Sequence, residues 1–200
     1  MVRFLGKVAV LAAIFLLCVA EGRANWQSAG ALNIPKHSYS FLSAGPSGDL
    51  LAVTFNNSPA NTAPVNLPAL LIRNPTTANP QVIELSKTMF ESQRGYSGVA
   101  ADDKGAFYVS GDTGNASTCF IKKFDMNGNP AEQFGRNGTV RPNRRVLGIE
   151  VMGNYVFALV DWGEAIVFDA TTGVTVGNVP KSNPSMFVRD IAIDPESMRT

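Results

Sequence analysis

Short apolar runs separated by turn residues occupy the chain from about residue 40 onward. The runs at 50–54, 106–110 and 155–159 are rich in aliphatic, β-branched and aromatic residues, and Gly, Asn, Asp or Pro stands at the boundaries between runs. After residue 24, no segment keeps the 3.6-residue apolar period of an amphipathic helix. Short strands bounded by turn signals are typical of all-β proteins, so the pattern predicts an all-β fold.

The apolar runs recur in a fixed order. Gly98-Val-Ala-Ala-Asp-Asp-Lys-Gly105 leads into the run at 106–110, and Gly148-Ile-Glu-Val-Met-Gly153 leads into the run at 155–159. A looser copy begins at Phe41, and the same figure starts again at Asp190. The unit therefore recurs every ~40 to 60 residues, which indicates a repeat architecture.

The second half of each unit recurs as well. The segment KFDMNG at 123–128 is similar to VFDATTG at 167–173, and IRNPTT at 72–77 is a looser first copy. We expect each to be a third strand that ends in an Asx-type turn and returns the chain as a fourth strand. The expected fourth strands are 81–85, a poorly defined run near 130–134, and 174–179.

Four strands in a unit of this length predict the blade of a β-propeller. We expect blades at 40–86, 96–135 and 146–179, with 187–200 as the start of a fourth. A blade buries both faces against its neighbours, so an arc of about three blades would leave two apolar faces in water. We therefore expect an incomplete, N-terminal part of a longer propeller, or a chain that closes its ring by association.

One repeat resembles a known family. Residues 98–115 read GVAADDKGAFYVSGDTGN and residues 124–128 read FDMNG, an order and spacing that resemble an NHL-type propeller repeat. The third copy has Asp161-Trp162-Gly163 at the family's corner, and the first carries a Pro- and Asn-rich insertion at 58–68. The match also departs from the family at 116–119. The resemblance implies a propeller, commonly of about six blades in this family.

The first 24 residues predict a secretory signal peptide. Arg3 and Lys7 precede an uncharged, mostly apolar run from 8 to 20. A membrane-spanning helix needs roughly 20 such residues, so this run is too short to span comfortably. Small residues at Gly22 and Ala24 suit cleavage after Ala24. We expect a secreted, periplasmic or cell-surface protein with no stable membrane span after cleavage, in which 25–39 is a leader or a ring-closing strand.

Charge and residue counts exclude several classes of function. The chain has 17 Lys and Arg against 16 Asp and Glu, so no basic field is available to attract nucleic acid. One His and two Cys leave little material for His-based catalysis or a Cys/His zinc site. GxSxG, P-loop and Rossmann glycine patterns are missing. We expect no catalytic residue, metal ligand or cofactor; a non-enzymatic protein is favoured, although the sequence leaves this question open.

Candidate ligand-binding residues are those expected where propellers bind, at the central funnel. The loops that line it join second to third strands, and fourth strands to the next first strand. The candidates are Asn56, Asp112, Asp161, Trp162, Arg145 and Arg189. Carboxylates, an indole and guanidinium groups that converge there could hold a sugar, a peptide or a cation.

A purely structural interpretation accounts for several of these residues. Asp112-Thr-Gly and Asp161-Trp-Gly are also what tight turns require, because Asp caps the backbone and Gly adopts positive φ. Asp102 and Asp103 are adjacent in an expected hairpin turn, where solvation explains both carboxylates. Adjacent turn residues do not form the shared cleft that paired carboxylates need for acid–base catalysis.

Two functions fit the sequence best. The leading hypothesis is a non-catalytic binding or scaffolding module for a protein or glycan ligand. The alternative is a metal-dependent propeller hydrolase or lyase, similar to gluconolactonase, that holds a divalent cation such as calcium and completes its site with blades outside this chain. A surface-structural repeat protein is a third interpretation.

Overall fold

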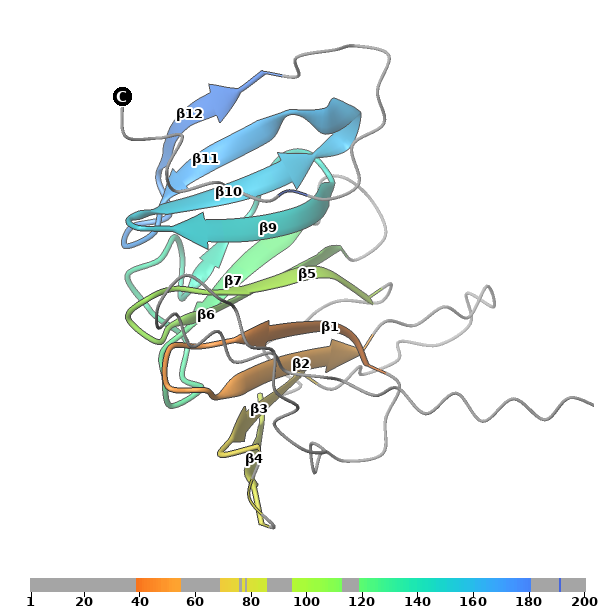
Figure 1. The fold of residues 1–200 in the computed structure, drawn as a ribbon. Helices are drawn as coiled ribbons and strands as arrows, with labels where there is room; N and C mark the ends of the chain where they lie inside the picture. Colours follow the sequence, from red (N-terminus) through yellow and green to blue (C-terminus); the bar gives the residue numbers. More distant parts are fainter. Residues whose placement is uncertain are drawn as a thin grey trace, which may run out of the picture.

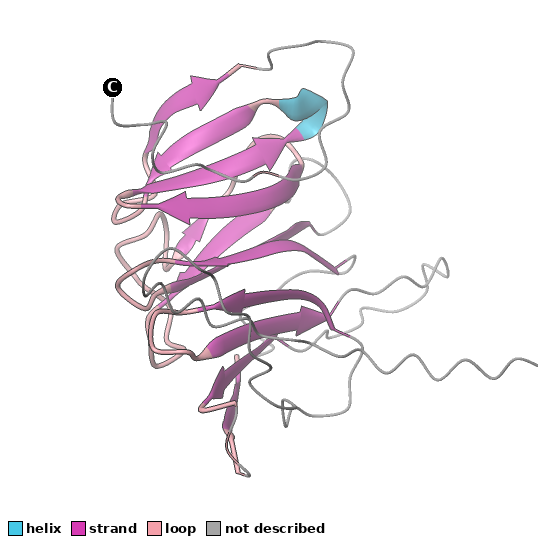
Figure 2. Ribbon diagram, viewed as in Figure 1, coloured by secondary structure: helices cyan, strands magenta, loops and turns pink. Residues whose placement is uncertain are grey.

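The computed structural model describes residues 39–54, 69–75, 77, 79–85, 95–112, 119–180 and 191. Within these ranges the chain forms twelve strands and one short 3-10 helix. The strands make three four-stranded antiparallel sheets (Figure 1 and Figure 2). The all-β fold expected from the sequence is confirmed.

The first sheet, blade 1, contains strands in simple chain order. They are β1 (Tyr39–Ala44), β2 (Leu50–Thr54), β3 (Ala69–Arg73) and β4 (Gln81–Glu84). Each strand pairs antiparallel with the next one along the chain. The expected strands at 50–54 and 81–85 therefore lie where the turn signals placed them.

The second sheet, blade 2, differs from expectation in its last strand. It contains β5 (Gly95–Ala101), β6 (Phe107–Asp112), β7 (Phe120–Phe124) and β8 (Thr139–Val140). The fourth strand was expected near 130–134, but Pro130 forms only an isolated bridge with Phe124. Proline has no N–H to give to a ladder, and Phe134 turns into the core with 0% of its surface exposed. The chain therefore regains the sheet only at Thr139.

The third sheet, blade 3, follows the expected strands closely. It contains β9 (Val146–Met152), β10 (Tyr155–Val160), β11 (Ala165–Asp169) and β12 (Thr175–Val179), with the 3-10 helix η3 (Asp161–Gly163) between β10 and β11. β12 is the outermost strand of its sheet and β9 the innermost. The expected fourth strand at 174–179 is confirmed.

The turns that follow Phe124-Asp125 and Phe168-Asp169, here called the FD turns, are stabilised by their aspartates. The Asp125 carboxylate accepts from the N–H groups of Asn127 and Asn129, each at 2.8 Å. Asp169 accepts in the same way from Thr171 and Thr172, at 3.0 and 2.7 Å. These bonds are the Asx-type turns that the sequence predicted.

The first copy of this turn is closed differently. It has Asn74 where the others have Asp, and Asn74 takes φ 49°. Its backbone carbonyl accepts from the Thr77 N–H at 3.0 Å and from the Thr77 hydroxyl at 2.9 Å. Asn tolerates the left-handed region better than most residues, so the looser copy still makes a tight turn.

The three sheets pack face to face through their innermost strands. β5 lies between β1 and β9, and β2 and β6 also contact the following blade (Figure 1). A Cβ added at Gly98 would lie 3.0 Å from the Ile149 N and 3.2 Å from the Gly148 Cα. The backbones of β5 and β9 therefore approach so closely that only glycine fits.

Two apolar cores fill the spaces between the blades. Leu51, Leu71, Phe107 and Phe124 lie in the core between blades 1 and 2. Tyr108, Ile121, Val156 and Phe168 lie in the core between blades 2 and 3. Blade 2 thus buries both faces, and successive sheets are linked from outermost to innermost strand. The described chain is an arc of three β-propeller blades.

Several sequence predictions fall outside the described residues. These are the signal peptide at 1–24, nearly all of the leader at 25–39, and nearly all of the partial blade at 187–200. In the part of the chain that is described, no helix has the length and apolar character needed to cross a bilayer.

Candidate functional site

The structure places four of the six candidate residues at one end of the sheets. Asp112 ends β6 and pairs with Gly95, the first residue of β5. Asp161 and Trp162 form η3, between the second and third strands of blade 3, and Arg145 immediately precedes β9. This end is where β5 and β9 begin and β6 and β10 end, on the right in Figure 1. The two remaining candidates, Asn56 and Arg189, lie outside the described residues.

Backbone hydrogen bonds bring Asp161 and Arg145 together. The Asp161 N–H donates to the Arg145 carbonyl at 3.0 Å. The Val160 N–H donates to the Glu164 carbonyl at 2.8 Å and closes the corner. Gly163 takes φ 79°, so the turn function expected for its sequence is confirmed at the glycine.

The guanidinium of Arg144 holds this corner. It donates to the Glu164 carboxylate and to the Asp161 carbonyl. Arg144 was not among the residues that the sequence pattern predicted, although the adjacent Arg145 was. The pair of arginines before a first strand was the available signal, but adjacent side chains point in different directions, and the sequence alone could not show which one turns towards η3.

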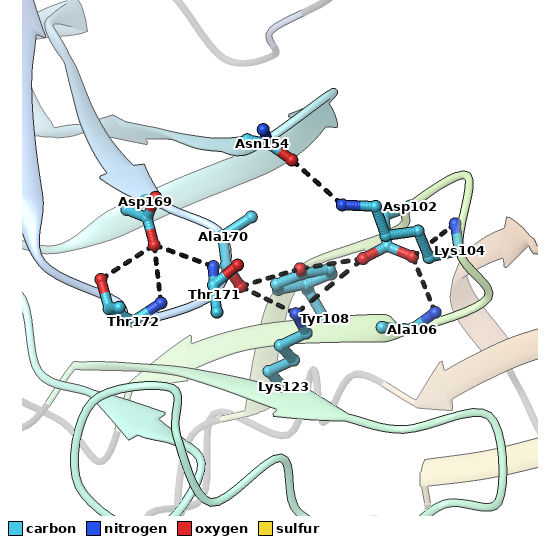
Figure 3. A network of polar contacts seen from close by, with 10 residues as sticks. All are labelled: Asp102, Lys104, Ala106, Tyr108, Lys123, Asn154, Asp169, Ala170, Thr171 and Thr172. Atoms are coloured by element: carbon cyan, nitrogen blue, oxygen red, sulfur yellow. Dashed lines mark hydrogen bonds and ion pairs between the residues drawn. The ribbon is translucent and has the colours of Figure 1, made fainter.

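A polar network occupies the opposite end of the sheets (Figure 3). Asp102, 7% exposed, accepts at Oδ1 from the N–H groups of Lys104 and Ala106, at 3.0 and 2.8 Å. Its Oδ2 accepts from the Tyr108 hydroxyl at 3.1 Å. The expectation of a solvated turn residue at Asp102 is wrong, because this carboxylate is buried and satisfied by protein donors.

Lys123 carries the network across to blade 3. Its Nζ donates to the Ala170 carbonyl at 2.7 Å and lies 4.0 Å from the Asp102 Oδ2. It also stands 5.2 Å from the centre of the Tyr108 ring. Tyr108 packs edge-on against Phe134, with ring centroids 5.8 Å apart. One amine is thus shared between a carboxylate and an aromatic face of blade 2 and a backbone carbonyl of blade 3.

Burial dominates the ionisation of this network. It raises the pKa of Tyr108 strongly, and the negative charge of Asp102 and its hydrogen bond raise it further. Burial also lowers the pKa of Lys123, and the Asp102 charge opposes that shift. Tyr108 therefore remains a neutral hydrogen-bond donor. Because three hydrogen bonds and the ion pair with Lys123 already engage the Asp102 carboxylate, it is suited to a structural role.

No set of three or more His, Cys, Asp or Glu side chains within the described ranges is arranged to hold a metal ion. The acidic residues of the corner, Asp161 and Glu164, belong to one short segment, and Arg144 already neutralises Glu164. The corner therefore combines guanidinium and carboxylate groups, and Trp162 is adjacent to Asp161 in the sequence.

Comparisons with known proteins report likenesses of fold only. No protein-family model matches the chain, and no curated protein matches it. The WD40 β-propeller domain of Doa1 is similar over 78% of this chain and 44% of its own, with 14% identity and a TM-score of 0.48. Apo AztD from Citrobacter koseri is similar over 71% and 47%, with 18% identity and a TM-score of 0.40.

BamB from Moraxella catarrhalis is a third similar structure, over 68% of this chain and 41% of its own, with 15% identity and a TM-score of 0.39. The chain thus spans less than half the length of these three solved chains. Because all three TM-scores are below 0.5, the assignment of propeller blades depends on the sheets and cores described above.

Proposed function

We propose that the chain is part of a secreted, periplasmic or cell-surface β-propeller that acts as a non-catalytic binding module for a protein or glycan. The secretory pattern of residues 1–24 supports the location. The NHL-like order of residues 98–128 supports a repeat propeller of that type, and the three blades supply the scaffold. Rigid scaffolds that present loops at one end are common binding surfaces.

The observation that carries this proposal is the clamped corner of blade 3. Arg144 ties Glu164 to the backbone of Asp161, and Asp161 in turn is bonded to Arg145. These contacts fix the start of β9 and η3 relative to each other. A preorganised corner loses less conformational entropy on binding than a free loop, which favours recognition.

Direct binding measurements test the proposal. Full-length protein is titrated calorimetrically with neutral oligosaccharides, uronate-containing oligosaccharides and defined peptides. We expect one class to bind, and Arg145→Ala to weaken that binding by about tenfold or more, as for a hydrogen bond to a charged group. Arg136→Ala, which removes an exposed arginine from the β7–β8 connection, is the matched control and leaves binding unchanged.

Two results would overturn the proposal. One is a failure of the binding test, in which no tested class binds or the control Arg136→Ala weakens binding as much as Arg145→Ala does. The other is turnover of lactones by the same protein that is lost with EDTA and restored by calcium, because that activity is the signature of the hydrolase alternative.

A further inference from the structure

The two junctions between blades place different chemistry at equivalent positions. Tyr108 pairs with Lys123 in the register of blade 2, as Leu51 pairs with Leu71 in blade 1. All four residues face the following blade. Blade 1 therefore meets blade 2 with leucines, whereas blade 2 meets blade 3 with a phenol and an amine.

The hairpin next to these strands differs in the same way. In blade 1, Ala44 pairs with Leu50, and at the equivalent position of blade 2, Ala101 pairs with Phe107. The next residue along the hairpin is Gly45 in blade 1 and Asp102 in blade 2, so these two residues correspond. A Cβ at Gly45 would lie 3.0 Å from the tip of the Phe107 ring. The first junction is closed by an aromatic ring over a glycine, and the second by a buried carboxylate.

We propose that the junction between blades 2 and 3 opens locally, ahead of the rest of the arc, and that Lys123 is the latch that keeps it closed. The latch comprises Asp102, Tyr108 and Lys123 of blade 2 and the carbonyl of Ala170 in blade 3 (Figure 3). The 2.7 Å bond from Lys123 to Ala170 is the shortest side-chain contact that the structure describes across the junction; the Tyr108 hydroxyl reaches the same carbonyl at 3.4 Å, and the exposed Lys104 amine bonds the Asn154 side chain at 3.0 Å.

The physical reason is the unequal cost of separating the two surfaces. When the junction between blades 1 and 2 opens, the leucine side chains enter water, and the hydration regained by the Arg73 guanidinium compensates for little of that apolar area. When the latch opens, the amine and the carboxylate regain hydration, which offsets much of their mutual attraction. The second junction therefore separates more easily, although it contains more polar contacts.

One backbone amide reports directly on this opening. The Gly135 N–H of blade 2 donates to the Thr172 carbonyl of blade 3 at 2.8 Å. This bond must break when the blades separate, whereas the ladder bonds of β6 and β10 remain intact within their own sheets. Hydrogen exchange at Gly135 thus distinguishes junction opening from global unfolding.

The test is residue-resolved hydrogen exchange by NMR on the full chain. In the unmodified protein we expect Gly135 to exchange faster than the central amides of β6 and β10. Lys123→Met should speed Gly135 exchange a further ~10- to 100-fold, which corresponds to loss of a charged hydrogen bond, and leave the β6 and β10 amides within a few-fold. Lys123→Arg keeps the charge and a donor and should restore most of the protection.

Two further variants keep the test falsifiable. Tyr108→Phe retains the ring and removes only the hydroxyl, so it should speed Gly135 exchange by ~2- to 10-fold and serves if Lys123→Met does not fold. Lys122→Met changes the adjacent lysine of β7, outside the latch, and should leave Gly135 unchanged. Equal acceleration of Gly135, β6 and β10 amides in the Lys123 or Tyr108 variants, or no acceleration at Gly135, would overturn the proposal.

Discussion

The two blade junctions share one hydrogen bond and differ in what surrounds it. Met126 and Ala170 both follow the aspartate of an FD turn, and each offers its carbonyl to a cation of the preceding blade. Arg73 donates to the Met126 carbonyl, and Lys123 donates to the Ala170 carbonyl. A turn that packs against a neighbouring sheet thus receives its donor from that sheet in both cases.

The surroundings of the two cations explain why the junctions differ chemically. Arg73 is the last residue of β3, and its guanidinium also bonds the Asn127 side-chain oxygen at 3.1 Å, while its Nε is buried and makes no hydrogen bond within the described residues. Lys123 lies inside the next core with only 15% of its side chain exposed. A buried amine needs a counter-charge, which Asp102 supplies, while the face of the neutral Tyr108 ring adds a cation–π contact. The same backbone carbonyl is therefore satisfied by a cation with a buried carboxylate beside it at one junction, and by a guanidinium that bonds an Asn side chain at the other.

The largest expected effect concerns the leucine junction. Leu71→Ala should lower the free energy of unfolding by about 2–5 kcal/mol, because a fully buried side chain leaves a cavity between two sheets. Chemical denaturation monitored by circular dichroism measures the change. Val82→Ala, on the exposed strand of the same blade, should cost less than ~0.5 kcal/mol. Equal costs at Leu71 and Val82 would contradict the view that apolar packing holds blades 1 and 2 together.

Replacing two glycines at the blade junctions should cause losses of stability of intermediate size. A Cβ at Gly173 would lie 2.8 Å from the Gly135 N, which is backbone, and Gly173 takes φ 71°. Gly173→Ala should therefore lose about 2–4 kcal/mol from left-handed strain and overpacking together. The equivalent Gly128 meets a Leu85 methyl at 2.9 Å, and that flexible side chain can move. Thermal unfolding should rank Gly173→Ala as the more damaging change.

Gly48 supplies the baseline for that ranking. It has φ 82° with no heavy atom within 4 Å of an added Cβ, so Gly48→Ala should cost only the ~1–2 kcal/mol of left-handed strain. If the three variants lose the same stability, close packing at the junctions contributes nothing beyond the backbone conformation of each glycine.

The smallest expected effect is the response to acid of the two FD turns. Burial alone would raise the pKa of Asp125, but hydrogen bonds from Asn129 and Asn127 outweigh it and lower the pKa. Bonds from Thr172 lower the pKa of Asp169. A depressed carboxyl pKa gives stability that is complete above the unfolded value, ~3.9, and is lost as pH falls through the folded value.

Urea unfolding between pH 2 and 7 checks this response. Stability should be flat with respect to these two groups above about pH 5 and should fall below about pH 4. Asp125→Asn and Asp169→Asn should each reduce the slope of that fall. An unchanged acid slope in both variants would show that the turn carboxylates are not the groups that acid titrates.

Local sequence patterns were sufficient for most strands and for the turns. The runs at 50–54 and 155–159 became strands because short, nearly continuous apolar runs between turn signals favour strands that are buried on both faces. Asp125 and Asp169 cap their turns because the acceptor and its donors are only two to four residues apart. The end of the sheets at which Asp112, Asp161 and Arg145 lie also followed from strand order alone.

Other features were misplaced because they depend on distant partners. β8 begins at Thr139 because Phe134 is drawn into a core that blade 3 completes. The Arg144 guanidinium bonds Glu164 and the Asp161 carbonyl, and these partners lie 20 and 17 residues farther along the chain. Strand order therefore predicted at which end of the sheets the described candidate residues lie, but not the hydrogen bonds that form the corner.

Asp102 shows most clearly where local sequence stops and tertiary structure begins. Its position in a hairpin turn follows from the residues beside it, since Gly105 and the flanking strands require a turn there. Its burial does not, because the Ala170 carbonyl that Lys123 reaches across the blade junction lies 47 residues away in the sequence from that lysine. Short apolar runs and turn residues act over a few positions, and they determine the strands and turns of each blade. The chemistry between blades is decided only when folding removes water from both surfaces at once.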